Sequence, residues 1–186
     1  MYEVELKLRA THEPLRERLA DRGAVHEGTV TQRDTYYDAP HRDFAATDEA
    51  LRVRIEEPVD GERAAEVTYK GPLVDDSSKT REEHETVVGS ETEIRAVLGA
   101  TGFDPAAVVE KERERFALDG YTVTLDEVAG LGEFIEIETA VETEGDIPIA
   151  RERARELLAD LGLDTDATIR TSYLGLLLES EGNVQK

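Results

Sequence analysis

Charged and apolar side chains alternate along most of the segments that the sequence predicts to be strands. Near the N-terminus, Glu3, Glu5 and Lys7 fall at odd positions, and the residues between them are apolar. Successive side chains of a strand point to opposite faces, so such a segment has one apolar and one charged face. The pattern recurs in six later segments, and the charged faces together carry both signs. A sheet of these strands must therefore place one strongly charged face against water, opposite charges or a ligand.

The sequence predicts eight strands and about four helices in a single domain, residues 1–186. We expect strands at residues 1–9, 25–37, 50–57, 64–70, 80–88, 108–118, 121–128 and 133–141, and helices at about 11–22, 90–100, 149–161 and 167–179. Thr11 and Ser90 are residue types that cap helices, and Asp119-Gly120 is typical of a tight hairpin turn.

Two folds satisfy this pattern. In the first, an α+β fold, the sheet closes into an eight-stranded antiparallel β-barrel, helices pack on its outside, and the charged face lines the lumen. In the second, the sheet stays open, with helices on one face and solvated charges on the other. Periodicity alone does not decide between them.

The charge balance and the absence of cysteine disfavour several classes of function. The chain has 22 Lys and Arg against 43 Asp and Glu, a formal net charge of −21. Such a negative field repels phosphate, so nucleic acids and anionic membranes are not expected as partners. Without Cys there is no thiol nucleophile, disulfide or Cys-ligated metal. The N-terminus has no apolar signal run and the longest apolar stretch is short, which predicts a soluble, cytoplasmic protein.

Lysine is scarce, with five residues against 17 Arg. Together with the acidic excess, this scarcity predicts a halophilic protein adapted to a salt-rich cytoplasm, where screening weakens self-repulsion. A merely acidic mesophilic protein is the alternative. If lysine is selected against, the remaining lysines are expected where a compact charge has a task.

The charged face can support metal and phosphate chemistry. Unpaired buried charges cost several kcal/mol each, so a lumen of this composition is expected to be wet, internally paired and ligand-filled. Converging carboxylates without Cys or nearby His form a hard oxygen site that suits Mg²⁺ or Mn²⁺. The many cations around such a metal favour a polyanion, and phosphate fits best because Arg binds it bidentately and Lys as a point charge.

The motifs resemble those of one known family. The segment Glu3-Val4-Glu5-Leu6-Lys7 matches the ExExK signature of the CYTH superfamily, the triphosphate tunnel metalloenzymes, which includes class IV adenylyl cyclases and thiamine triphosphatases. The rest of the family pattern follows in order over nearly the whole chain: Arg33 to Asp38, Leu51 to Arg54, Thr68 to Gly71, Arg81 to Glu85, Lys111 to Arg113, Leu125-Asp126 and Glu136 to Glu138.

The resemblance implies roles for individual residues. The divalent metals, two ions by this resemblance, would be held by Glu3, Glu5, Glu136, Glu138 and Asp126. The triphosphate would be bound by Lys7, Arg52, Arg54, Lys70, Arg81, Lys111 and Arg113. Among these, Lys70 and Lys111, together with Tyr36, are the candidate catalytic residues; for Tyr36, packing in the core is the alternative.

The resemblance leaves the reaction open. The chain looks most like the cyclase branch, which implies conversion of ATP to cyclic AMP and pyrophosphate. Hydrolysis of the terminal phosphate of inorganic or thiamine triphosphate is the alternative, and a non-catalytic polyphosphate or nucleotide sensor is a second one. A homodimer through the outer sheet and helices is plausible.

Overall fold

The computed structural model describes residues 1–74 and 78–184. Their strands form one closed barrel in the order β1-β5-β4-β3-β2-β6-β7-β8, and every neighbouring pair is antiparallel. The strands are β1 (Tyr2–Arg9), β2 (Val25–Asp38), β3 (Ala50–Pro58), β4 (Ala64–Leu73), β5 (Lys79–Val88), β6 (Asp104–Leu118), β7 (Tyr121–Val128) and β8 (Gly132–Val141). The predicted closed eight-stranded antiparallel barrel is thus confirmed, and the open sheet is excluded.

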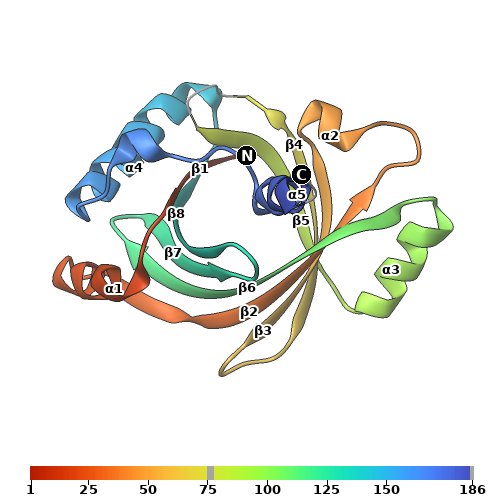
Figure 1. The fold of residues 1–186 in the computed structure, drawn as a ribbon, viewed down its shortest axis with the longest axis horizontal. Coiled ribbons are helices and arrows are strands. Elements are labelled where there is room, and N and C mark those ends of the chain that lie inside the picture. Colours follow the sequence, from red (N-terminus) through yellow and green to blue (C-terminus); the bar gives the residue numbers. More distant parts are fainter. Residues whose placement is uncertain (75–77, 185–186) are drawn as a thin grey trace.

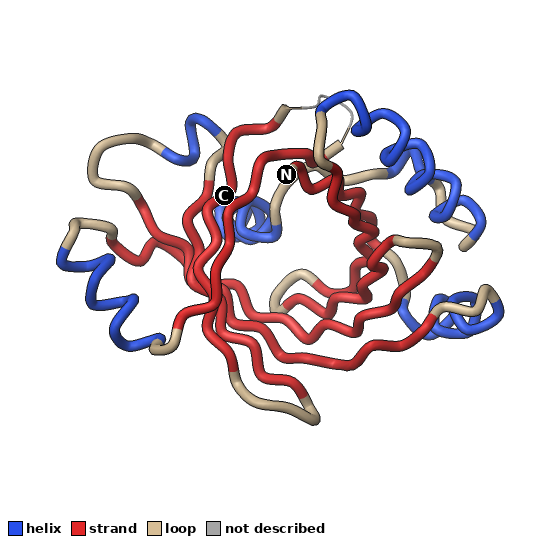
Figure 2. The backbone as a smooth tube through the Cα atoms, turned by 180° about the vertical axis from the view of Figure 1, so that it is seen from behind, coloured by secondary structure: helices blue, strands red, loops and turns tan. Residues whose placement is uncertain are grey.

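Helices surround the barrel, and one lies within it. They are α1 (His12–Asp21), α2 (Phe44–Thr47), α3 (Glu91–Ala100), α4 (Ile147–Asp160) and α5 (Tyr173–Val184), with 3-10 turns η1 (Glu144–Asp146) and η2 (Thr165–Ala167). In Figure 1, α1 and α4 lie outside one side of the ring of strands and α3 outside the other, whereas α5 is seen nearly end-on inside the ring. Figure 2 shows the same arrangement from behind.

The apolar outer face of the barrel packs against these outer helices. Leu6 of β1 is buried in one cluster with Leu15 of α1 and Leu158 of α4. A second cluster joins Val53 of β3 to Leu98 of α3. Burial of each such side chain contributes about 1.5–3 kcal/mol, so the helices fix which face of the sheet turns outward. The charged face is therefore left to line the interior.

Local signals account for most element boundaries. Asp119 and Gly120 both have positive φ, 51° and 83°, as the predicted two-residue hairpin turn between β6 and β7 requires. The hydroxyl of Ser90 accepts a hydrogen bond from the Glu93 N–H at 3.2 Å and caps α3. Thr11 is the N-cap residue of α1 but its side chain makes no cap hydrogen bond.

The prediction was wrong for the last helix, which begins at Tyr173 and not near residue 167. The Ser172 hydroxyl accepts a hydrogen bond from the Gly175 N–H at 3.0 Å, so the helix starts after this serine. Strand β6 also starts earlier than expected, at Asp104, since a register shift opposite Tyr36 and Tyr37 accommodates Pro105.

The segment between α4 and α5 contacts β1 where β1 is no longer paired with β5. Strand β1 pairs with β8 along residues 2–9 but with β5 only along residues 2–5. Beyond β5, the Lys7 carbonyl accepts a hydrogen bond from the Ile169 N–H at 2.7 Å. This hydrogen bond fixes the segment before α5 against β1, so that Tyr173, the first residue of α5, lines the interior of the barrel. Among the helices described, none has both the length and the apolar character needed to cross a bilayer.

Candidate functional site

A cavity of about 800 Å³ lies inside the barrel. The predicted site residues that line it are Glu3, Glu5, Tyr36, Arg52, Arg54, Lys70, Arg81, Lys111, Arg113, Glu136 and Glu138. The other two, Lys7 and Asp126, are almost fully buried in the wall, at 1% and 0% exposure. Period-two alternation therefore brings the charged positions of distant strands to one cavity.

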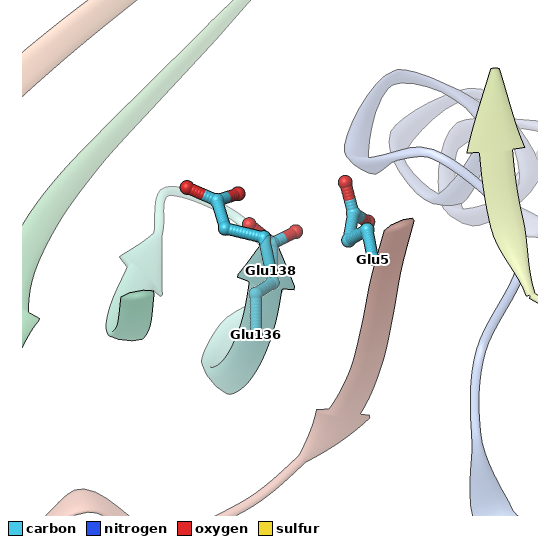
Figure 3. A group of neighbouring side chains, drawn as sticks. All are labelled: Glu5, Glu136 and Glu138. Atoms are coloured by element: carbon cyan, nitrogen blue, oxygen red, sulfur yellow. The ribbon is translucent and has the colours of Figure 1, made fainter. Parts of the chain in front are cut away.

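Three of the predicted metal-binding carboxylates converge. Glu5 of β1 lies opposite Glu138 of β8 in the strand register, and Glu136 is two residues before Glu138. Figure 3 shows the three side chains rising from these neighbouring strands, and one carboxylate oxygen from each lies within 4.8 Å of the others. Glu5 Oε1 is buried and has no hydrogen-bond partner within the described part of the chain. Lys7 and Lys79 reach this oxygen only as ion pairs of 3.5 Å. Such a set of hard oxygen donors fits Mg²⁺ or Mn²⁺.

The carboxylates differ in how well their charge is compensated. Burial acts to raise the pKa of Glu136, but Arg113, Lys111 and Lys7 hold it well below its usual range. Burial and the nearby Glu3 instead raise the pKa of Glu138. The local surplus of negative charge therefore lies on the Glu138 side of the cluster, where a bound cation would relieve it.

Asp126 organises a group of cations at the Lys111 end of the bore. Arg113 donates to both of its carboxylate oxygens, at 2.6 and 2.5 Å, and Lys111 donates to Oδ2 at 3.1 Å. The hydroxyl of Tyr173 donates to the same Oδ2 at 2.9 Å. Arg113 also donates to Glu136. Because Asp126 is already engaged by four donors and does not line the cavity, the structure does not place it with the three convergent glutamates.

Asp34 binds a second pair of cations, Arg52 and Arg54, as Asp126 binds Arg113 and Lys111. Arg54 donates to its two carboxylate oxygens at 2.7 Å each, and Arg52 Nη1 lies 3.6 Å from Oδ2. Burial opposes ionisation of Asp34, but Arg54 and Arg52 hold its pKa well below the usual range. Arg52 also donates to the Thr68 hydroxyl at 2.9 Å. These contacts fix both guanidinium groups in the wall of the cavity.

The remaining predicted cations have carboxylate partners near the cavity edge. Lys70 donates to Glu83 at 2.6 Å and lies 3.5 Å from Glu3. Burial and the proximity of Glu3 raise the pKa of Glu83, although Lys70 opposes this, whereas Lys70 keeps the pKa of Glu3 low. Two carboxylates thus share one ammonium group.

Two arginines retain unused donors. Arg81 donates to the Asp48 carbonyl at 2.7 Å and to its carboxylate at 3.2 Å. The Nε atoms of Arg81 and Arg52 are buried without hydrogen-bond partners among the described residues. A buried donor without a partner is costly, so the protein contacts leave part of the donor capacity of both guanidinium groups unused.

The sequence analysis missed several charged or aromatic residues of the site, among them Asp34, Lys79 and Tyr173. Asp34 belongs to the Arg33–Asp38 motif and shares the parity of Tyr36, so its inward position could have been inferred. Lys79, whose Nζ lies 3.5 Å from Glu5 Oε1, is one of the few lysines and could have been found by that scarcity. Tyr173 gave no signal, because it was assigned to the interior of an amphipathic helix.

Comparison with known proteins agrees with this geometry. A family model for the CYTH domain matches residues 1–173. The chain belongs to the CYTH family. A protein of Methanocaldococcus jannaschii, provisionally named an adenylate cyclase, is 36% identical over 177 residues, covering 95% of this chain and 98% of that protein. A solved structure from Pyrococcus horikoshii is 42% identical with a TM-score of 0.89, covering 96% of this chain and 99% of the other.

The CYTH fold also extends to more distant proteins. A structure from Hippeastrum, described as an adenylyl cyclase candidate with a dominant triphosphatase activity, has a TM-score of 0.63 at 18% identity and covers 96% of this chain and 95% of its own. At that identity the likeness shows the fold alone. In the present chain the CYTH match includes the whole barrel and ends at Tyr173, the first residue of α5.

Proposed function

We propose that this CYTH protein is a metal-dependent enzyme that acts on a triphosphate, and more specifically that it converts ATP to cyclic AMP and pyrophosphate. The observation that carries the proposal is the cavity inside the barrel, which a cluster of three glutamates lines together with several lysines and arginines. A polyphosphate with a divalent cation matches this juxtaposition of charges.

In this proposal Glu5, Glu136 and Glu138 hold Mg²⁺ or Mn²⁺, with Glu3 as a further carboxylate from the same face of β1. A divalent ion at these oxygens supplies Lewis-acid chemistry, which lowers the pKa of the attacking 3′-hydroxyl and offsets phosphate charge. The sequence resemblance implies two ions. Asp126 accepts hydrogen bonds from Arg113 and Lys111, and we assign it to positioning these cations.

The cationic wall binds the triphosphate and stabilises the pyrophosphate that leaves. Asp34 and Asp126 hold Arg54 and Arg113 in place before substrate arrives, so little reorganisation is needed as negative charge develops. Lys70 and Lys111 line the same cavity and contribute compact charges that offset charge on the leaving group. Tyr36 lines the cavity as well and also packs against the buried apolar cluster that contains Phe134 and Tyr173, so we assign it to shaping the site and not to proton transfer.

An apolar part of the cavity supports a nucleotide over inorganic triphosphate. Phe44 and Ala45 of α2, Leu73 of β4, and Leu174 and Leu178 of α5 line the same space as the charged residues. Inorganic triphosphate has no apolar portion that would use this lining, whereas a nucleoside has a base and a sugar. The full-length relative named as an adenylate cyclase adds to this support.

The test is one incubation of the protein with ATP and Mg²⁺ or Mn²⁺ in molar KCl, with products separated by chromatography. We expect cyclic AMP and pyrophosphate in equal amounts. Orthophosphate from inorganic triphosphate, with ATP left intact, would replace the cyclase with a triphosphatase at the same site. Absence of turnover of either substrate would leave a binding protein.

Two substitutions test the metal-binding part of the proposal. Glu5→Gln and Glu136→Gln remove one charged ligand each with little change in shape, and we expect each to lower kcat at least 100-fold. Glu112→Gln is the matched control, because Glu112 lies on the same barrel but is exposed on its outer face. Undiminished activity in Glu5→Gln or Glu136→Gln would remove that carboxylate from the metal site.

A further inference from the structure

We propose that Tyr173 is a positioning residue that holds the ammonium groups of Lys7 and Lys111 at the wall of the cavity in which the triphosphate would bind. The inference rests on the proposed function, because it assigns a role in the same cavity. The inference also goes beyond the proposed function, since none of the motifs that indicated that function includes this tyrosine.

The ring of Tyr173 lies against both lysines. Lys7 Nζ is 4.5 Å from the ring centroid and Lys111 Nζ is 5.0 Å from it. Both distances are within the range of cation–π attraction, which contributes about 0.5–2 kcal/mol per contact, with the larger values at desolvated sites. The ring in turn packs edge-to-face on Phe134, with centroids 5.0 Å apart. Tyr173 is 7% exposed, so its ring is fixed by packing.

Lys7 depends on this ring more than Lys111 does. Its ammonium group is buried and makes no hydrogen bond within the described part of the chain. Its ion pairs are long, at 3.5 Å to Glu5 and 3.8 Å to Glu136. Lys111, by contrast, donates to Asp126 at 3.1 Å. From α5, the Tyr173 ring contacts the Lys7 ammonium and adds to these two long ion pairs.

Tyr173 also connects the two lysines to the rest of the cationic group. Its hydroxyl donates to Asp126 Oδ2, the oxygen that accepts from Lys111 and Arg113. Two contacts fix the backbone directly before Tyr173. The Ile169 N–H donates to the Lys7 carbonyl, and the Ser172 hydroxyl caps α5. One aromatic side chain thus contacts cations from β1 and β6 at once.

The test separates the ring from the hydroxyl. Tyr173→Leu removes the ring, and we expect tripolyphosphate to bind about tenfold more weakly, which corresponds to about 1.4 kcal/mol. Tyr173→Phe keeps the ring, and we expect a change of less than threefold. Tyr121→Leu is the matched control, because Tyr121 lies outside the bore and donates to the Ala150 carbonyl of α4. It should lower stability without changing the affinity for tripolyphosphate.

Binding is measured by calorimetry in molar KCl, once with EDTA and once with Mg²⁺, and kcat and KM for ATP are measured in parallel. A positioning role predicts a higher KM in Tyr173→Leu with kcat changed less. If that variant fails to fold, Tyr173→Met replaces it, because methionine fills irregular space without a ring.

The two proposals fail in different ways. If the wild-type protein binds tripolyphosphate under neither condition, the proposed function is wrong. If the wild-type protein binds and the ring-deleted variant binds equally well, the role of Tyr173 is wrong while the proposed function stands. An equal loss in Tyr173→Phe and Tyr173→Leu would assign the effect to the hydroxyl and overturn the role of the ring.

Discussion

Replacement of Asp126 by Asn tests whether this carboxylate positions cations or binds a metal. Asp126 has no exposed surface and accepts from Arg113, Lys111 and Tyr173. Removal of one partner from a buried ion pair typically costs about 3–5 kcal/mol, since it leaves charge without compensation. Arg113 keeps Glu136 as a second partner, so we expect the lower end, about 3 kcal/mol. For a chain of this length, that lowers Tm by roughly 6–12 °C.

The assay is thermal unfolding in EDTA and molar KCl, conditions that remove metal and screen surface pairs more than buried ones. Thr124→Val is the matched control, because Thr124 lies on the same strand and its buried hydroxyl has no hydrogen-bond partner among the described residues. We expect it to be neutral or stabilising. A metal ligand would behave in the opposite way: its neutralisation relieves repulsion between carboxylates in the metal-free protein. A Tm of Asp126→Asn within about 2 °C of wild type, or above it, would refute the positioning role.

Two further predictions concern pH. Burial, and next the charge of Arg113, lower the pKa of Lys111 to about 8. Only the charged amine attracts phosphate, so kcat/KM for ATP should fall as pH rises through about 8. Lys111→Arg should lack this alkaline decline, because arginine stays charged. A pH profile that the substitution leaves unchanged would contradict the role of Lys111 in the decline. Hydrogen bonds from Arg115 lower the pKa of Glu56 to about 2. The stability from this pair is complete above the unfolded-state pKa of about 4.3 and is lost as pH falls toward 2. After allowance for partial exposure it is about 1 kcal/mol, so urea unfolding should show Glu56→Gln less stable than wild type at pH 6 by that amount, with a difference that shrinks between pH 5 and 3. A constant difference would exclude the ionised pair as its source.

The alternation of the strands made the direction of the charged side chains predictable. In the barrel Glu5 is paired with Glu138 and Lys7 with Glu136, and all four belong to the face that the period-two pattern identified. Closure was not predictable from that pattern. It depends on β1 pairing with both β5 and β8, which are far from it in sequence, and no local signal reports such contacts.

The missed parts of the site depend on contacts of the same long-range kind. Asp34 and Tyr173 matter because of which cations lie beside them, and those cations come from other strands. The incorrect start of the last helix had a local cause, the unrecognised cap at Ser172. This error concealed Tyr173, because a residue in the middle of an amphipathic helix is expected to pack in the core and not to begin a helix at the edge of a charged bore.

The pairing of charges divides the buried carboxylates of the bore into two groups. Asp34 and Asp126 are each held by short contacts from an arginine to both oxygens, so a metal ion would have to displace guanidinium groups to reach them. Glu5 instead has only ion pairs of 3.5 Å to Lys7 and Lys79, and one of its oxygens has no hydrogen bond in the described structure. The aspartates therefore orient the cations that would meet phosphate, while Glu5 and Glu138 remain able to bind a metal. Glu136, which accepts from Arg113 and also lies beside Glu5, joins the two groups. If this division is correct, Asp34→Asn should weaken binding of tripolyphosphate in EDTA, whereas Glu5→Gln should not. The reverse result in calorimetry would show that the two groups have been assigned the wrong way round.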